Sequence, residues 1–112
     1  MPDTVLILVG PEFDDLEVWY PKLRLEEAGY AVRTAGLEDD EYRGRAGLSI
    51  AVDGSIGDFS PEDLSGIIVP GGWAPDRLRR DPEVLAAIRA LDEEGRLVAA
   101  ICHGGSVLVS AG

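Results

Sequence analysis

The chain has 112 residues, 46% of them hydrophobic, which is enough for one domain with a core and argues against a disordered chain. Its formal net charge of -11 argues against binding to nucleic acids or to anionic membranes, because both rely on clustered lysines and arginines. The single cysteine excludes an internal disulfide, and no signal peptide or membrane-spanning run is recognisable, so we expect a cytoplasmic protein.

The first elements predicted along the chain are a buried strand and a helix. Residues 4–9 form a continuous apolar run, which is typical of a strand in a parallel sheet. A helix is expected from residue 14 or 15 to about residue 28, where Gly29 suits the position after its end. Its apolar residues recur at helical spacing: Leu16, Trp19, Tyr20 and Leu23.

The remaining elements alternate in type. In chain order they are a strand at residues 30–35, a hairpin at 41–52, a helical turn after Ser60, a strand at 66–69, a helix from Pro82 to Gly95, a strand at 97–101 and a helix from His103. Alternation of this kind predicts an α/β fold with a doubly wound parallel sheet, in one domain over residues 1–112. The last helix has about two turns and no strand after it, so we expect the C-terminal part of the domain to be missing or supplied by a second polypeptide.

Cys102 is the strongest candidate for a catalytic residue. In "AICHG" the cysteine stands between a predicted strand and a helix that begins with glycines, which is the plan of a nucleophile elbow. The elbow places the thiol at the carboxyl edge of the sheet and at a helix N-terminus, where a thiolate is favoured. The alternative is an ordinary buried cysteine.

The loop "VPGG" follows another predicted strand and can lie beside the elbow. The backbone N–H groups of Gly71 and Gly72, with that of His103, are candidates for an oxyanion hole. The alternative is a tight turn that needs glycine.

Glu17 is a third candidate, because it lies among apolar neighbours on the first helix. Pro21 cannot donate to the carbonyl of residue 17, so a kink is expected there, and the carboxyl could hydrogen-bond to Cys102. An exposed helical glutamate is the alternative.

His103 is not predicted to act as the base for Cys102 unaided, since neighbouring side chains at an elbow point in different directions. It would need an orienting carboxylate, and Asp76 of this chain or of a neighbouring subunit is the candidate. Otherwise Asp76 is an acid at the start of a helix. No cofactor is expected, because no Gly-x-Gly-x-x-Gly follows the first strand. No metal is expected either, because adjacent elbow residues do not readily share one ion.

Three segments together resemble the PfpI-type intracellular proteases (the ThiJ/PfpI family) of the class I glutamine amidotransferase-like superfamily. They are "FDDLEVWYPKLRLEEAGYAV", "VPGGWAPDRLRRDPEVLAAIRALDEEGRLVAAICHG" and "SVLVSAG". The resemblance implies a flavodoxin-like three-layer α/β/α sandwich, a homo-oligomer, and roles for Cys102, His103 and Glu17, with a third acid near Asp76. The chain departs from the family in having Asp76 where glutamate is usual, Gly105 where proline is frequent, and no further strands and helices after residue 112.

The resemblance favours a cysteine-dependent hydrolase acting on peptide or amide bonds. A glyoxalase III-type enzyme or deglycase acting on methylglyoxal or its adducts would use the same residues. A stress-response chaperone or a redox sensor based on Cys102 is the non-enzymatic alternative. The sequence leaves the choice among them, the substrate and the oligomeric state open.

Overall fold

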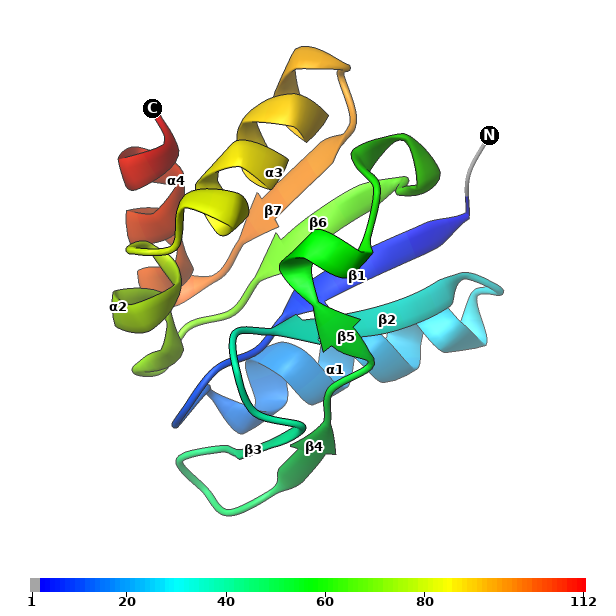
Figure 1. Cartoon of the computed structure of the whole chain (residues 1–112). Helices are drawn as coiled ribbons and strands as arrows, with labels where there is room; N and C mark the ends of the chain where they lie inside the picture. Colours follow the sequence, from blue (N-terminus) through cyan, green and yellow to red (C-terminus); the bar gives the residue numbers. More distant parts are fainter. Residues whose placement is uncertain (1–2) are drawn as a thin grey trace.

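The computed structural model describes residues 3–112 as an α/β sandwich (Figure 1). Seven strands occur in the described residues: β1 (Thr4–Leu8), β2 (Ala31–Gly36), β3 (Glu41–Arg43), β4 (Ser49–Ala51), β5 (Gly54–Ser55), β6 (Gly66–Val69) and β7 (Leu97–Ala100). The α-helices within residues 3–112 are α1 (Asp15–Glu27), α2 (Ala74–Leu78), α3 (Pro82–Glu93) and α4 (Gly105–Ala111). Short 3₁₀ turns lie at Ile56–Asp58, Pro61–Asp63 and Cys102–Gly104.

The main sheet is parallel and has the order β5-β2-β1-β6-β7, while β3 and β4 form a separate antiparallel hairpin. The chain leaves β1 through α1 to β2 on one side, and leaves β6 through α3 to β7 on the other. The two directions part between β1 and β6, and the carboxyl ends of strands at such a switch point are where open α/β sheets bind ligands.

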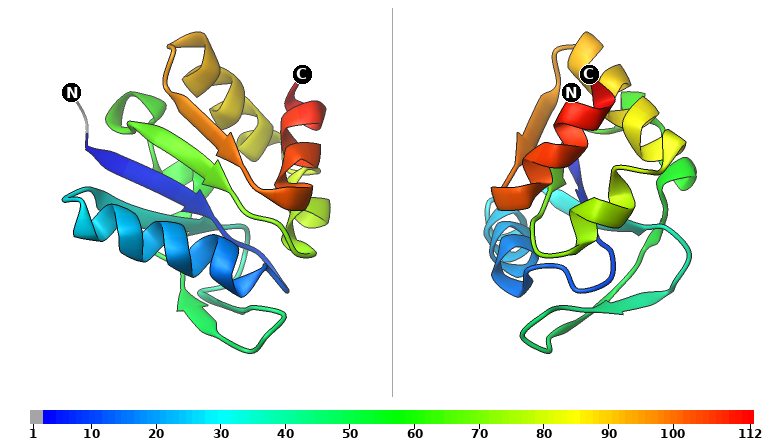
Figure 2. Two further views of the ribbon diagram at one scale, coloured as in Figure 1. Left: turned by 180° about the vertical axis from the view of Figure 1, so that it is seen from behind. Right: turned by 90° about the vertical axis from the view of Figure 1, so that its left-hand side faces the viewer.

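The helices form layers on the two faces of the sheet. Figure 2 shows α1 on one face and α3 on the other, with α4 beside α2 and α3. β1 and β6 are buried almost completely, as expected for strands covered on both faces, whereas residues 98–101 around the end of β7 are only half-buried. No helix within residues 3–112 is long and apolar enough to cross a membrane.

The predicted parallel α/β architecture is confirmed, and its elements begin and end close to the expected residues. Helix α1 begins after Asp14, whose side chain accepts from the N–H of Glu17, and Gly29 follows its end with a φ of 100°. Helix α3 begins after Asp81, which accepts from the N–H groups of Glu83 and Val84. The helix after the elbow begins with a 3₁₀ turn and becomes α-helical only at Gly105.

Three features differ from the sequence-based expectation. Helix α2 and the two-residue strand β5 were not predicted, because both are too short to show a periodic pattern. Most of the apolar row that indicated α1 does not face the core: the exposed fractions of Leu16, Tyr20 and Leu23 are 71%, 69% and 56%, and only Trp19 of this row packs against the core. Val18 and Asp15 are instead the buried residues of this helix.

Candidate active site

Cys102 stands at the carboxyl end of β7 in a strained backbone conformation. Its φ of 54° lies in the left-handed region, which non-glycine residues rarely adopt. The next turn is equally constrained, because a side chain on Gly104 would collide with the backbone carbonyls of Val69 and Pro70 at the end of β6. The elbow therefore needs glycine at residue 104, and it presents Cys102 on the surface.

The thiol and the imidazole of the elbow lie next to each other. The distance between Cys102 Sγ and His103 Nδ1 is 3.4 Å, within reach of a hydrogen bond to sulfur, and both side chains are exposed. This differs from the expectation that the two side chains would diverge, because a left-handed residue followed by a 3₁₀ turn brings them to one side. The two groups thus come within hydrogen-bonding distance, and the need for a carboxylate that orients His103 stays a prediction.

Glu17 reaches the same place from the first turn of α1. Its Oε1 accepts a hydrogen bond of 2.8 Å from the N–H of Gly71, which is buried at the end of β6. A Cβ atom on Gly71 would collide with the Glu17 carboxylate and would lie 3.0 Å from Cys102 Cβ. Glu17 Oε1 and Cys102 Cβ therefore both border the space that a side chain on residue 71 would occupy, so this residue has to be glycine.

The three backbone donors expected for an oxyanion hole are not equivalent. The N–H of Gly71 is engaged with Glu17. Gly72, with a φ of 76°, lies in the same pocket as His103. Gly72 and His103 thus remain the candidates for binding an oxyanion, and Gly71 serves to hold Glu17.

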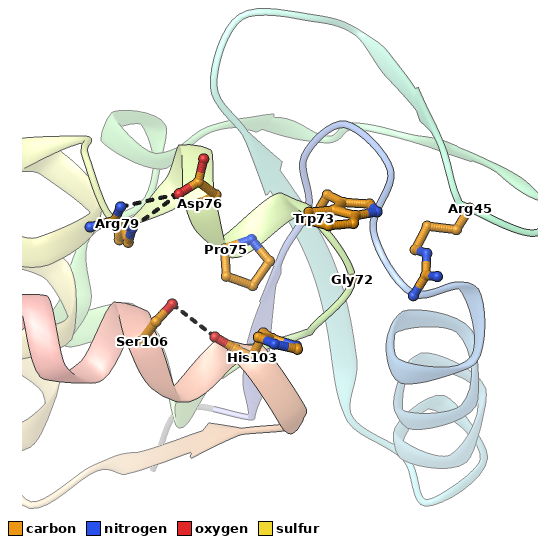
Figure 3. A pocket seen from close by; sticks show the side chains of 8 residues that line it. All are labelled: Arg45, Gly72, Trp73, Pro75, Asp76, Arg79, His103 and Ser106. Atoms are coloured by element: carbon orange, nitrogen blue, oxygen red, sulfur yellow. Dashed lines mark hydrogen bonds and ion pairs between the residues drawn. The ribbon is translucent and has the colours of Figure 1, made fainter.

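Asp76 does not orient His103 within this chain. Its two carboxylate oxygens pair with Arg79 at 3.1 Å and with Arg80 at 3.0 Å. Figure 3 shows the carboxylate directed toward Arg79, away from His103, although both residues line one pocket. Contact with the histidine of a neighbouring subunit stays a prediction.

The pocket beside the elbow has a volume of about 450 Å³ and contains residues that the sequence reasoning missed. Arg45 comes from the β3–β4 hairpin, Trp73 from the loop after β6, and Ser106 from α4 (Figure 3). Trp73 is 63% exposed. No local motif marks these residues, because they come from three separate segments that only the folded chain brings together. Within residues 3–112, no cluster of His, Cys, Asp or Glu could hold a metal ion.

A buried carboxylate fixes the loop that carries Arg45. Asp15 is 5% exposed, and its two oxygens accept hydrogen bonds of 2.8 Å from the N–H groups of Ala46 and Leu48. Burial acts to raise the pKa of Asp15, but these backbone donors and the nearby charge of Arg45 outweigh it and hold the pKa below 3.8. The N–H of Arg45 itself donates to the carbonyl of Phe13.

The model of the DJ-1/PfpI family matches residues 3–112. The chain belongs to the DJ-1/PfpI family. It is 40% identical over 108 residues to a deglycase from Pyrococcus horikoshii and 38% identical to the deglycase PfpI from Pyrococcus furiosus. Each match covers 96% of this chain and 65% of the relative, so the chain spans just under two thirds of their length.

Other members of the DJ-1/PfpI family extend the comparison. YraA from Bacillus subtilis, provisionally named a cysteine protease, is 36% identical and is covered over 65% of its length. A solved two-domain protein from Anabaena variabilis, with DJ-1/ThiJ/PfpI-like and ferritin-like domains, aligns with a TM-score of 0.93 at 34% identity over 97% of this chain and 32% of that one. Oxidized DJ-1 from Toxoplasma gondii aligns with a TM-score of 0.89 at 28% identity, and the alignment covers 97% of this chain and 61% of that one.

Proposed function

We propose that this chain carries the active site of a cysteine-dependent enzyme of the deglycase type, in which the thiolate of Cys102 attacks the carbonyl carbon of methylglyoxal adducts. The observation that carries the proposal is the convergence of Cys102, His103 and Glu17 at the carboxyl edge of the sheet. The names of the relatives at 40% and 38% identity support deglycase chemistry over the other activities of the family.

The proposed first step uses the pair at the elbow. His103 accepts the thiol proton through Nδ1, which lies 3.4 Å from Sγ, and the thiolate then forms a bond to the carbonyl carbon. The electron pair of the C=O bond moves to oxygen, where the N–H groups of Gly72 and His103 stabilise the negative charge. The proton held by His103 then neutralises that oxygen, which gives a hemithioacetal. Glu17 or His103 then transfers the proton of the neighbouring hydroxyl group of the adduct to its nitrogen, so that the C–N bond breaks, the amine leaves and the hydroxyl-bearing carbon becomes a carbonyl.

A peptidase is the second candidate, favoured by the provisional naming of YraA as a cysteine protease. The same thiolate would attack a peptide carbonyl, the amine would leave with the proton from His103, and water would hydrolyse the resulting thioester. The two candidates differ in the substrate and not in the residues used.

Turnover of methylglyoxal adducts and of a fluorogenic peptide by wild type and by the Cys102→Ala variant tests the proposal. Loss of adduct turnover by at least about 1000-fold is expected, because the variant lacks the nucleophile. Ser110→Ala, an exposed change on α4, is the matched control and should retain full activity. Adduct turnover that survives in Cys102→Ala would contradict the proposed function, and surviving peptide cleavage would exclude the peptidase.

A further inference from the structure

The pocket beside the elbow is positively charged in a protein that is strongly negative. The charged side chains lining it are Arg45, Arg79 and Asp76. The carboxylate of Asp76 is engaged by Arg79 and also by Arg80, which leaves the charge of Arg45 without a counter-ion in the pocket. Because the chain has a net charge of -11, a positive excess among the side chains lining this pocket is a specific feature and does not reflect the general composition.

Arg45 has an uncommitted guanidinium group. Asp15 interacts electrostatically with Arg45, but both oxygens of that carboxylate accept hydrogen bonds from the backbone N–H groups of Ala46 and Leu48. Among residues 3–112, the arginines that form ion pairs are Arg24, Arg77, Arg79, Arg80 and Arg96. The side chain of Arg45 is exposed at the pocket, so its planar set of donors is available to a ligand.

The backbone that carries Arg45 is fixed in advance. Its N–H donates to Phe13, and the following residues are tied to Asp15 on the first turn of α1. An arginine on such a loop loses little conformational freedom when it binds an anion, and that raises affinity. The exposed indole of Trp73 lies between Arg45 and Pro75 in Figure 3, and it offers an apolar surface in the same pocket.

We propose that Arg45 binds a carboxylate of the substrate, and that the site prefers small carbonyl compounds that carry a carboxylate over neutral ones. A guanidinium group binds a carboxylate through two parallel hydrogen bonds, and a pocket of about 450 Å³ suits a small molecule. The carbonyl part of this assignment rests on the proposed function, whereas the preference for an anion rests on the pocket alone.

Alkylation of Cys102 tests the preference without any turnover. Iodoacetate and iodoacetamide have nearly the same size and differ in charge, and each forms a bond to the thiolate sulfur as iodide leaves. Because Cys102 is the sole cysteine, every alkylation event reports on this site. Arg45→Gln should slow the reaction with iodoacetate about fivefold, the effect of one charge in a partly solvated site, and leave the iodoacetamide rate unchanged.

Arg43→Gln is the matched control. Arg43 belongs to the same hairpin and carries the same charge, but it lines a neighbouring pocket that does not contain His103. It should change neither rate by more than about 1.5-fold, the effect expected of a screened surface charge. Equal slowing of iodoacetate by the two substitutions, or equal slowing of both reagents by Arg45→Gln, would overturn the proposal.

Competitive inhibition of adduct turnover by glyoxylate and by acetaldehyde, which are small aldehydes with and without a carboxylate, gives the second arm. Arg45→Gln should raise the inhibition constant of glyoxylate about fivefold, while kcat for the adduct and the inhibition constant of acetaldehyde stay the same. An unchanged inhibition constant for glyoxylate would contradict the proposal. If the adduct is not turned over, the proposed function fails, and the alkylation rates still decide whether Arg45 selects anions.

Discussion

At Cys102 the backbone itself is part of the site. Cys102 and Glu12, at φ values of 54° and 55°, are the non-glycine residues with positive φ in the described part of the chain. A left-handed conformation costs about 1–2 kcal/mol for such residues. Both lie in segments that meet at the carboxyl edge of the sheet, since the carbonyl of Glu12 accepts from Trp73 beside the pocket. Strain of this kind persists only where the surrounding structure fixes it.

Gly71→Ala should disable the site without unfolding the protein. The added methyl group would meet the Glu17 carboxylate and Cys102 Cβ, so Glu17 would have to move away and its bond to the Gly71 N–H would be lost. We expect turnover to fall by at least about tenfold, as for the loss of a positioning contact of about 1.4 kcal/mol or more.

Gly105→Ala is the control for this change. A Cβ atom there meets no other atom within 4 Å, and the backbone is helical with a φ of -58°. This variant should keep its activity and gain about 0.5–1 kcal/mol in the free energy of unfolding, measured in urea. Full activity in Gly71→Ala would show that the contact between Glu17 and Gly71 has no part in catalysis.

At the level of single residues, the candidate site residues could be predicted from the sequence better than the contacts between them. Cys102, His103 and Glu17 could be found because an elbow, an adjacent imidazole and a carboxyl among apolar residues are local patterns. The pairing of Gly71 with Glu17, and of Asp76 with two arginines, depends on distances between segments that no local pattern contains. Arg45 was missed for the same reason.

Among the elements, the β3–β4 hairpin depends on one buried carboxylate. Asp15 binds two backbone N–H groups of the connecting loop, and a side chain on Gly44 would collide with it. Because its folded-state pKa lies below 3.8, its contribution to stability is complete above that pH and is lost as the pH falls through the lowered value. Acid is therefore expected to release this loop.

Asp15→Asn should lower the free energy of unfolding by about 1–3 kcal/mol at neutral pH, because an amide replaces one acceptor with a donor that faces an N–H group. Below pH 4, which is about the ordinary pKa of an aspartate, the free energy of unfolding of the variant should also depend less on pH than that of wild type. Urea unfolding followed between acidic and neutral pH measures both effects, with the exposed Asp92→Asn as control. Identical pH profiles for wild type and Asp15→Asn would refute the role of this carboxylate.

The strands and the longer helices could be predicted because their signals are periodic or continuous, as in residues 4–9 and in the cap at Asp81. The orientation of α1 could not be predicted. Its apolar row marks a helix but does not say which face is buried, and here Leu16 and Tyr20 are exposed while the charged Asp15 is buried. The Asp15 carboxylate can be buried because two backbone N–H groups of the hairpin donate hydrogen bonds to it. These donors lie more than 30 residues further along the chain, so no local pattern reveals them.

For the molecule as a whole, β7 is an open edge of the sheet. Among residues 3–112 it pairs with β6 alone, and the N–H groups of Leu97 and Ile101 donate to that side. In a parallel pair, alternate residues point to opposite sides, so the N–H groups of Val98 and Ala100 face away from β6. Leu97 is 57% exposed, which leaves this edge available for pairing.

Hydrogen exchange measured by NMR should distinguish this edge from the centre of the sheet. The amides of Val98 and Ala100 should exchange at least about 100-fold faster than those of Leu6 and Ile7, because β1 lies between β2 and β6. Equal protection of both sets would mean that the edge is paired in solution, and a dilution series would then show whether a second copy of the chain provides the pairing.

The hairpin carries Arg45, which we propose to select the substrate, whereas the proposed nucleophile lies elsewhere in the fold. Within residues 3–112 the strands of the hairpin form a sheet separate from the main one. Hydrogen bonds with residues 12, 13, 15 and 34, and the buried side chains of Tyr42 and Ile50, attach it to the rest. The proposed nucleophile, Cys102, lies in the 3₁₀ turn between β7 and α4, in a different part of the chain. If Tyr42, Ile50 and the contacts of Asp15 are kept, loops of other sequence could be exchanged between β3 and β4 on an unchanged elbow. We expect such variants to differ in the molecules that they accept while sharing the proposed reaction.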